Sequence, residues 1–166
     1  MTELHPPSSG PDALPPAFRD EEGALEPDGS EPPARDPMAG VYYPTTRPGG
    51  RLPHVWLEKD GTRRGAHDFL LPGRFLLICG ESGWRKAAAA TAGALGVAIE
   101  TVVIGAEGEW RDIEGGWSQV REIGDDGAVL VRPDGHAAWR AKARPADPAQ
   151  AIETAMRRIL RRDKTS

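Results

Sequence analysis

Residues 129–140 of this chain read Val-Leu-Val-Arg-Pro-Asp-Gly-His-Ala-Ala-Trp-Arg, and they predict how the C-terminal half folds. Two apolar-rich runs flank Pro133-Asp134-Gly135. These are turn residues, because proline fixes the first φ angle and glycine accepts a positive one. The pattern predicts a β-hairpin that places Arg132 opposite His136.

Alternation along these two strands sorts their side chains onto two faces. We expect one face to hold Val129, Val131, Ala137 and Trp139, and the other to hold Arg132, His136 and Arg140.

A β-α-β unit is predicted upstream of this hairpin. Residues 75–79 form a continuous apolar run, typical of a strand that is covered on both faces. The alanine-rich residues 84–95 predict a helix, with Ser82 as its N-cap and Gly96 as its C-terminal stop. Residues 97–104 follow as a second, β-branched strand.

Shorter elements complete the predicted domain. A strand at 54–57 and a turn at 59–62 return the chain toward 69–71. One short helix is expected near 117–123. A last helix begins at Asp147 as N-cap, followed by Pro148 at its first position and Gln150 as capping-box partner. The inward stripe of that helix is Ile152, Met156 and Ile159, with Leu160 beside them.

The order strand, helix, strand, short helix, hairpin, helix is the layout of a thioredoxin-like sheet. We therefore predict an α/β fold with a mixed sheet flanked by helices. The predicted domain spans 41–162, with a short tail at 163–166. Residues 1–40 hold nine acidic and two basic side chains and nine of the sixteen prolines. Such sequence buries too little apolar surface to order itself, so we expect a largely disordered arm.

Composition argues against several classes of protein. Residues 41–166 carry 19 basic and 16 acidic side chains, a balance of +3 that does not indicate a nucleic-acid surface. A single cysteine excludes an internal disulfide and fits a reducing, cytoplasmic compartment. No secretory signal or membrane-length apolar run is visible. The four histidines show no metal-ligand spacing.

Cys79 and Ser82 are the two candidate nucleophiles. Cys79 ends a strand before a helix, where thioredoxin-like proteins place a reactive thiol, but Ser82 stands where their second cysteine would be. A buried cysteine acting as a small apolar residue is the simpler interpretation. Ser82 lacks the G-x-S-x-G pattern of a hydrolase, because Trp84 occupies the second glycine position.

Three further stretches carry a family resemblance. Residues 43–49 read Tyr-Pro-Thr-Thr-Arg-Pro-Gly, residues 51–57 read Arg-Leu-Pro-His-Val-Trp-Leu, and residues 73–80 read Gly-Arg-Phe-Leu-Leu-Ile-Cys-Gly. Together with 129–140, they resemble the C-terminal domain of FAD-dependent aromatic-ring hydroxylases, particularly phenol and chlorophenol monooxygenases. Residues 25–37 are weakly similar to the end of the preceding substrate domain.

The resemblance implies a thioredoxin-like domain without the redox cysteine pair. In that family the domain packs on the flavin-binding body and often contributes to dimer contacts. The flavin site itself belongs to an upstream Rossmann-type fold with G-x-G-x-x-G, which this chain lacks. The resemblance therefore implies no catalytic, metal or cofactor-binding residue here. The residues it marks as a structural or interaction signature are Arg51, Pro53, His54, Trp56, Arg132, Asp134, Gly135, His136, Trp139 and Arg140.

We expect a stand-alone or truncated C-terminal module of a flavin-dependent phenol-type monooxygenase, without catalysis of its own. Its expected partner is a flavin-binding monooxygenase subunit or a second copy, rather than nucleic acid or membrane. Joined to the missing half, it would serve an NAD(P)H- and O2-dependent hydroxylation that uses FAD. Two alternatives stay open: a thiol redox protein using Cys79, and, less favoured, a serine hydrolase at Ser82.

Overall fold

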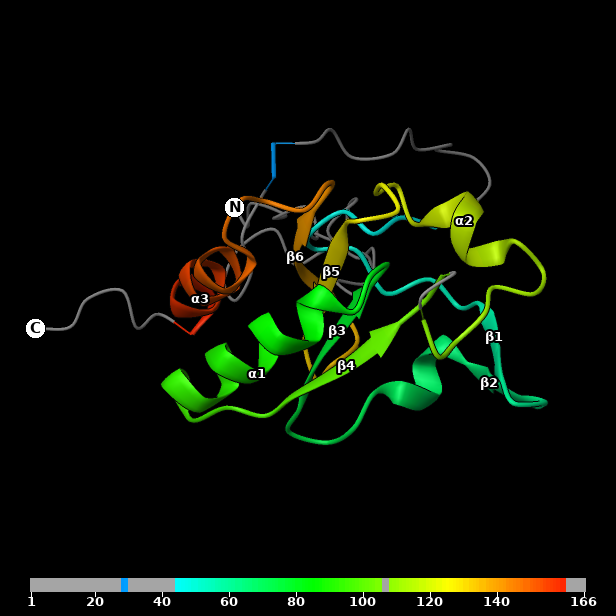
Figure 1. Ribbon diagram of the computed structural model, residues 1–166, viewed down its shortest axis with the longest axis horizontal. Coiled ribbons are helices and arrows are strands. Elements are labelled where there is room, and N and C mark those ends of the chain that lie inside the picture. The colour runs from blue at the N-terminus through cyan, green and yellow to red at the C-terminus, as the bar shows by residue number, and fades with distance from the viewer. Residues whose placement is uncertain (1–27, 30–43, 106–107, 161–166) are drawn as a thin grey trace, which may run out of the picture.

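The computed structural model describes residues 28–29, 44–105 and 108–160 (Figure 1). Most of the predicted arm at 1–40 and the tail at 163–166 lie outside the described residues. Within the described part, the chain forms a mixed α/β structure with a four-stranded sheet, as the sequence predicts.

The central sheet has the strand order β4-β3-β5-β6. Its strands are β3 (Phe75–Cys79), β4 (Ile99–Val103), β5 (Ala128–Val131) and β6 (Ala137–Ala141). Strands β3 and β4 are parallel, and α1 (Gly83–Leu95) makes the crossover between them. Strands β5 and β6 form the predicted antiparallel hairpin, and β5 pairs with β3. Every residue of β3 is buried, as expected for a strand covered on both faces.

Two helices cover one face of this sheet. Helix α1 packs beside α3 (Pro148–Ile159), and both lie to the left of the sheet in Figure 1. The predicted stripe of α3 is confirmed, since Ile152, Met156 and Ile159 are buried against Leu77 and Leu130 of the sheet. Trp84 at the start of α1 is fully buried in the same cluster.

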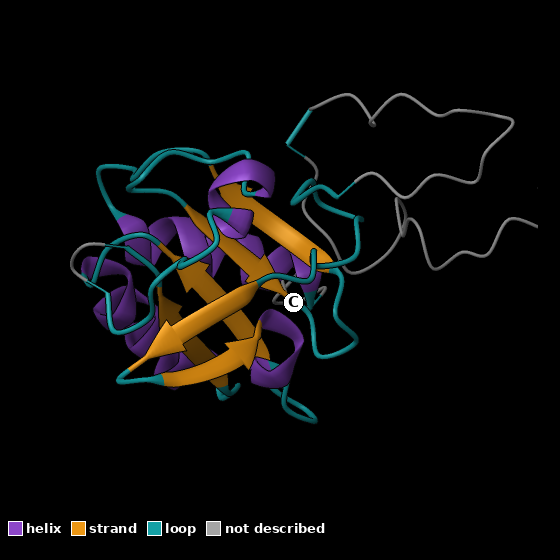
Figure 2. Cartoon of the chain, turned by 90° about the vertical axis from the view of Figure 1, so that its right-hand side faces the viewer, coloured by secondary structure: helices purple, strands orange, loops and turns teal. Residues whose placement is uncertain are grey.

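The opposite face is covered by a second layer. It contains β1 (Trp56–Lys59), β2 (Thr62–Gly65), the 3-10 helix η3 (Ala66–Phe69) and α2 (Gly116–Val120). Viewed from the right-hand side of Figure 1, the β1–β2 hairpin lies in front of the sheet (Figure 2). Leu57, Phe69 and Trp117 contribute buried side chains to this half of the core.

The incoming segment, defined here as residues 44–55, belongs to this second layer. It follows the outer edge of β6, where Gly49 N–H donates to Ala137 O and Ala137 N–H donates to Gly50 O, both at 2.8 Å. Leu52 N–H continues the pairing to Gly135 O at 2.8 Å. Leu52 and Val55 are buried in the core of this layer. The segment is thus part of the folded domain rather than a loose linker.

The predicted assignment of side chains to the two faces of the β5–β6 hairpin is partly wrong. Arg132 does lie opposite His136, because Arg132 N–H donates to His136 O at 2.8 Å. The register shifts, however, so that Val131 pairs with Ala137 while Leu130 pairs with Trp139. This bulge adds Ala138 to one strand and reverses the faces beyond it. Trp139 therefore packs toward the α1–α3 layer, whereas Arg140 shares the face of Val129.

The helix ends confirm some capping predictions and correct others. Asp147 caps α3 as predicted, since its Oδ1 accepts from Gln150 N–H at 3.0 Å. The Gln150 side chain does not close a capping box but donates to Thr154 Oγ1 at 3.2 Å. Ser82 occupies the N-cap position of α1 without a side-chain cap bond, and Gly96 ends that helix with a φ of 65°. None of the helices in the described ranges has the length and apolar character to span a bilayer.

Candidate functional site

The turn of the β5–β6 hairpin gathers four of the predicted signature residues, Arg132, Asp134, Gly135 and His136. Arg132 Nε donates to Asp134 Oδ1 at 3.1 Å, and the guanidinium makes a second bond to Asp134 Oδ2. His136 N–H also donates to Asp134 Oδ1 at 3.1 Å, and His136 Nδ1 lies 3.3 Å from that oxygen. Asp134 therefore joins two strands that the sequence only placed opposite each other.

The charge state of Asp134 follows from these contacts. Partial burial of the carboxyl group opposes ionisation, but hydrogen bonds from Arg132 and from His136 N–H, with the positive charges nearby, outweigh it. The pKa of Asp134 is consequently lowered below its ordinary value. Gly135 completes the turn with a φ of 90°, a conformation that glycine adopts readily. In this turn the Asp134 carboxylate accepts hydrogen bonds from both strands, through Arg132 and through His136 N–H.

Arg140 lies elsewhere, in a buried ion cluster of its own. Its side chain is 2% exposed, and its guanidinium binds the carboxylate of Asp28. Nη1 also lies 3.1 Å from Thr46 Oγ1 and 3.6 Å from Glu122 Oε1. A buried cation is tolerated when carboxylates and hydrogen bonds surround it. The predicted grouping of Arg140 with Arg132 and His136 is therefore wrong.

The Arg140 cluster fixes the start of the incoming segment. Thr46 N–H donates to Glu122 Oε1 at 2.9 Å, and Thr45 Oγ1 donates to the same oxygen at 2.5 Å. Thr46 Oγ1 also donates to Arg121 O. Asp28, Thr46 and Glu122 escaped prediction because they lie far from Arg140 in sequence. One sequence feature could have indicated such partners. Arg140 lies within the apolar run 137–141, and a buried arginine needs a carboxylate to balance its charge.

The remaining signature residues lie along the incoming segment and β1. Arg51 is exposed and pairs through its backbone with His136, whereas Pro53 is buried. His54 and Trp56 are exposed, and their rings meet edge to face with centroids 5.1 Å apart. The structure thus brings Arg51 close to the hairpin turn, while His54 and Trp56 form a separate surface.

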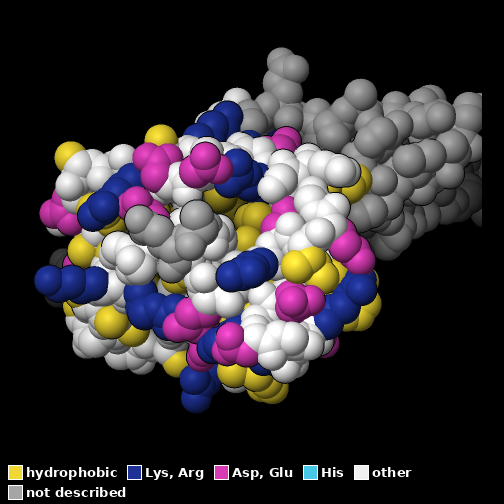
Figure 3. Space-filling model, turned by 45° about the vertical axis from the view of Figure 1, so that its right-hand side comes forward, with side chains coloured by type: hydrophobic (Ala, Val, Ile, Leu, Met, Phe, Trp, Pro, Cys, Tyr) yellow, Lys and Arg dark blue, Asp and Glu magenta, His cyan; other side chains and the backbone are white. Residues whose placement is uncertain are grey.

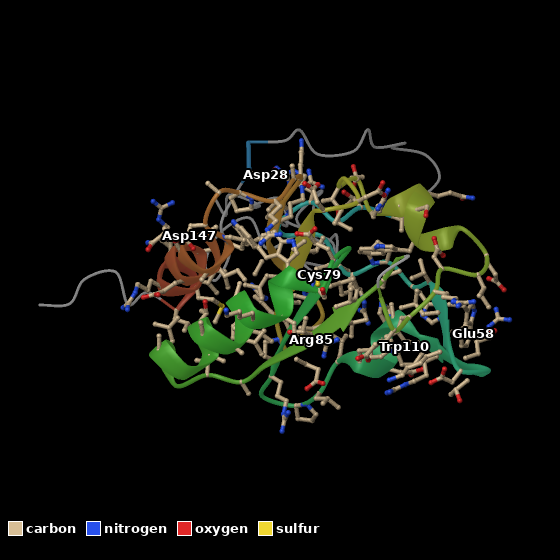
Figure 4. All side chains as sticks on the ribbon, viewed as in Figure 1. Asp28, Glu58, Cys79, Arg85, Trp110 and Asp147 are labelled. Carbon is tan, nitrogen blue, oxygen red and sulfur yellow. The ribbon has the colours of Figure 1, made fainter. Side chains whose placement is uncertain are left out.

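Cys79 does not offer the environment of a reactive thiol. It is 1% exposed and lies between β3 and the α1 layer (Figure 4). Its Sγ–H points to Val102 O at 3.7 Å. Burial raises the pKa of the Cys79 thiol to about 12, despite the opposing charge of Arg85. Near neutral pH the thiol is protonated, and a protonated thiol is a poor nucleophile.

This raised pKa predicts a pH effect on stability. The unfolded thiol ionises around its ordinary pKa of 9.0, while the folded thiol keeps its proton until about pH 12. Stability contributed by the protonated thiol is therefore full below pH 9.0 and lost as pH rises toward 12, at no more than about 1.4 kcal/mol per pH unit. Above pH 9.0, urea unfolding should show a steeper fall of stability with pH for the wild type than for Cys79→Ala. At pH 7, Cys79 of the folded protein should react slowly with iodoacetamide. A rapid reaction of the folded protein would contradict its burial.

A cavity of about 410 Å³ opens at the carboxyl ends of β3 and β4. Its lining includes Gly80, Trp117 and Ser118, one arginine and four carboxylates. The carboxylates belong to Glu81, Asp112, Asp125 and Asp126. Such a lining repels the pyrophosphate of a dinucleotide, which binds at helix N-termini and cationic groups. The cavity residues therefore do not fit FAD. Within the described residues, no three His, Cys, Asp or Glu side chains are grouped to hold a metal ion.

Comparison with known proteins assigns the family. Residues 45–162 match the family described as aromatic-ring hydroxylase, C-terminal. The chain belongs to this family. The resemblance carried by residues 43–57, 73–80 and 129–140 is thereby confirmed.

Relatives from curated proteins agree with this assignment. The chain is 44% identical over 125 residues to 2,4-dichlorophenol 6-monooxygenase of Cupriavidus pinatubonensis, covering 73% of this chain and 21% of that protein. It is 40% identical over 129 residues to phenol 2-monooxygenase of a Pseudomonas species, covering 75% and 21%. This chain therefore spans about a fifth of the length of these relatives.

Solved structures show the same relation. The flavin-dependent monooxygenase PieE, in complex with FAD and substrate, superposes with a TM-score of 0.78 at 44% identity, covering 87% of this chain and 25% of that one. Aklavinone-11 hydroxylase, in a ternary complex with FAD and aklavinone, gives 0.74 at 37% identity, with 87% and 26% covered. The chain corresponds to a C-terminal fragment of flavin-dependent aromatic hydroxylases.

Proposed function

We propose that this chain is an accessory module of a flavin-dependent, phenol-type aromatic monooxygenase. By itself it carries out no hydroxylation, and it acts by binding the flavin-binding body of such an enzyme. The observation that supports this most directly is the extent of the match, which covers the C-terminal family and about a fifth of the curated relatives.

Two features of the chain support a role without catalysis. The sequence has no G-x-G-x-x-G for a dinucleotide, and the acidic cavity at β3 and β4 does not fit one. At the Asp134 turn and the Arg140 cluster, the carboxylates of Asp134 and Asp28 are already bonded to arginines of the fold. Joined to a flavin-binding body, the module would serve NAD(P)H- and O2-dependent hydroxylation of a phenolic ring.

A thioredoxin-like thiol function at Cys79 is disfavoured by the structure. The buried thiol with its raised pKa lacks both the access and the thiolate fraction that thiol exchange requires. In our proposal, the likeness to thioredoxin is limited to the order of the strands. The redox chemistry belongs to the flavin-binding partner, and both proteins are cytoplasmic.

Reconstitution tests the accessory role. The probe is the body of the Cupriavidus 2,4-dichlorophenol 6-monooxygenase without its region that matches this chain, purified in a form that retains FAD absorbance. We expect the full-length chain alone to oxidise no NAD(P)H in the presence of FAD and 2,4-dichlorophenol. Mixed with the FAD-loaded body, it should sediment as a complex. Substrate-dependent NAD(P)H oxidation by the chain alone, or no complex, would refute the proposal.

A further inference from the structure

The outer face of the β1–β2 hairpin carries an exposed tryptophan, Trp56, whose ring contacts two neighbouring side chains. Trp56 is 39% exposed, while its neighbour Leu57 is fully buried on the inner face. Arg63 of β2 places its guanidinium carbon 4.7 Å from the centroid of the Trp56 ring, and His54 packs edge-on at 5.1 Å. The indole therefore has two side-chain neighbours that restrict it, which lowers the entropy lost when a partner covers it.

Backbone geometry holds His54 in this position. Gly65 lies opposite Trp56 in the strand register, and a Cβ at residue 65 would lie 2.6 Å from His54 Cε1. The missing side chain thus leaves room for the His54 ring beside the indole. The ring also lies 5.2 Å from His67, whose Nε2 is 2.6 Å from Leu52 O.

The surface extends from β2 to the loop before α2. Arg63 forms an ion pair with Glu114, and the adjacent Ile113 is 43% exposed. We call His54, Trp56, Arg63, Ile113 and Glu114 the Trp56 face. Figure 3 shows one face of the molecule, on which hydrophobic side chains lie beside charged ones of both signs. Tryptophan and arginine within a polar rim are typical of interface centres.

The path of the chain indicates what covers this face. The incoming segment reaches β1 directly, and it lies in the layer opposite α1 and α3. Asp28, which precedes it, binds Arg140 on that same side of the sheet. In the two solved relatives, whose complexes contain FAD, about three quarters of the chain lies outside the matched region. Asp28 therefore marks the side of the domain that carries the Trp56 face. A flavin-binding body that connects through the segment around Asp28 would be held on that side.

We propose that the Trp56 face is the surface on which the flavin-binding body of an aromatic-ring hydroxylase docks. This inference rests on the accessory function proposed above and names its binding site. The body must offer an apolar recess for the Trp56 indole, with acceptor groups at its margin for the indole N–H and the Arg63 guanidinium. A second copy of this chain is the competing occupant.

Titration with a matched pair of variants tests this site. The wild-type chain, Trp56→Ala and Leu71→Ala are each titrated against the FAD-loaded body of the Cupriavidus enzyme, and complex formation is followed by sedimentation velocity. Leu71 is the control because it is also 39% exposed but lies in the turn between η3 and β3. We expect Trp56→Ala to raise the dissociation constant at least about tenfold and Leu71→Ala to change it less than about twofold.

The outcomes separate the two proposals. If the wild-type chain does not bind the body, the accessory function itself fails. If all three proteins bind equally, the accessory function stands and the Trp56 face is not its site. If the wild-type chain alone forms a dimer that Trp56→Ala abolishes, the face is a self-association surface and docking of the body there is refuted. Circular dichroism of each variant excludes misfolding as the cause of lost binding.

Discussion

Arg140→Met is expected to lower the free energy of unfolding by about 3 kcal/mol, because it removes the cation between two carboxylates. Asp28 and Glu122 would keep their charges without the buried guanidinium, and Thr46 Oγ1 would lose its contact with Nη1. Urea denaturation followed by tryptophan fluorescence measures the loss. Hydrogen exchange should rise first at the backbone amides of 45–52, since the cluster fixes that segment.

Arg144→Met is the matched control for this prediction. Arg144 also pairs with a carboxylate, Glu81 Oε1 at 2.8 Å, but its side chain is 46% exposed. Exposed ion pairs contribute less than about 1 kcal/mol. Equal losses for the two variants would show that Arg140 does not act as a buried anchor.

Trp84→Ala is expected to lower the free energy of unfolding by about 3–5 kcal/mol. Trp84 is fully buried between α1 and the sheet, and its ring meets that of Trp139 with centroids 6.1 Å apart. Its Nε1–H donates to Asp126 O at 2.8 Å, which ties the start of α1 to the loop before β5. Calorimetry or urea denaturation would show the cavity and the lost hydrogen bond together.

Two further variants separate the contributions of burial and of the hydrogen bond to this loss of stability. Trp84→Phe keeps much of the apolar volume but leaves Asp126 O without its indole donor, so we expect an intermediate loss of about 1–3 kcal/mol. Trp56→Ala makes the same truncation at an exposed ring and should cost less than about 1 kcal/mol. A large loss for Trp56→Ala would place that ring in the folding core rather than on a docking surface.

Local sequence signals predicted most of the fold. The Pro133-Asp134-Gly135 turn, the buried run at 75–79 and the alanine-rich helix each depend on residues that are neighbours in sequence. The last helix was predicted because Asp147, its N-cap, and its apolar stripe lie within three turns of each other. These elements sufficed for the mixed sheet with flanking helices, whereas the gathering of α1 and α3 on one face was not predicted.

Long-range features escaped the sequence patterns. Strict alternation assigns Trp139 to the face of Val129, but the bulge at Ala138 reverses it. That bulge is set by the pairing of the whole strand, so no local pattern marks it. The acidic partners of Arg140 come from residues 18 and 112 positions away, and a family signature records Arg140 without its partners. The docking surface that we propose at Trp56 likewise depends on structural observations, namely the exposure of the ring and its contacts with His54 and Arg63.

We propose that this chain serves flavin chemistry without binding the flavin itself. Equilibrium dialysis of the purified full-length chain against FAD tests it most directly, with flavin absorbance read on both sides of the membrane. We predict equal absorbance on the two sides at every protein concentration. Retention of FAD in proportion to the protein would contradict the claim and assign a flavin site to these residues.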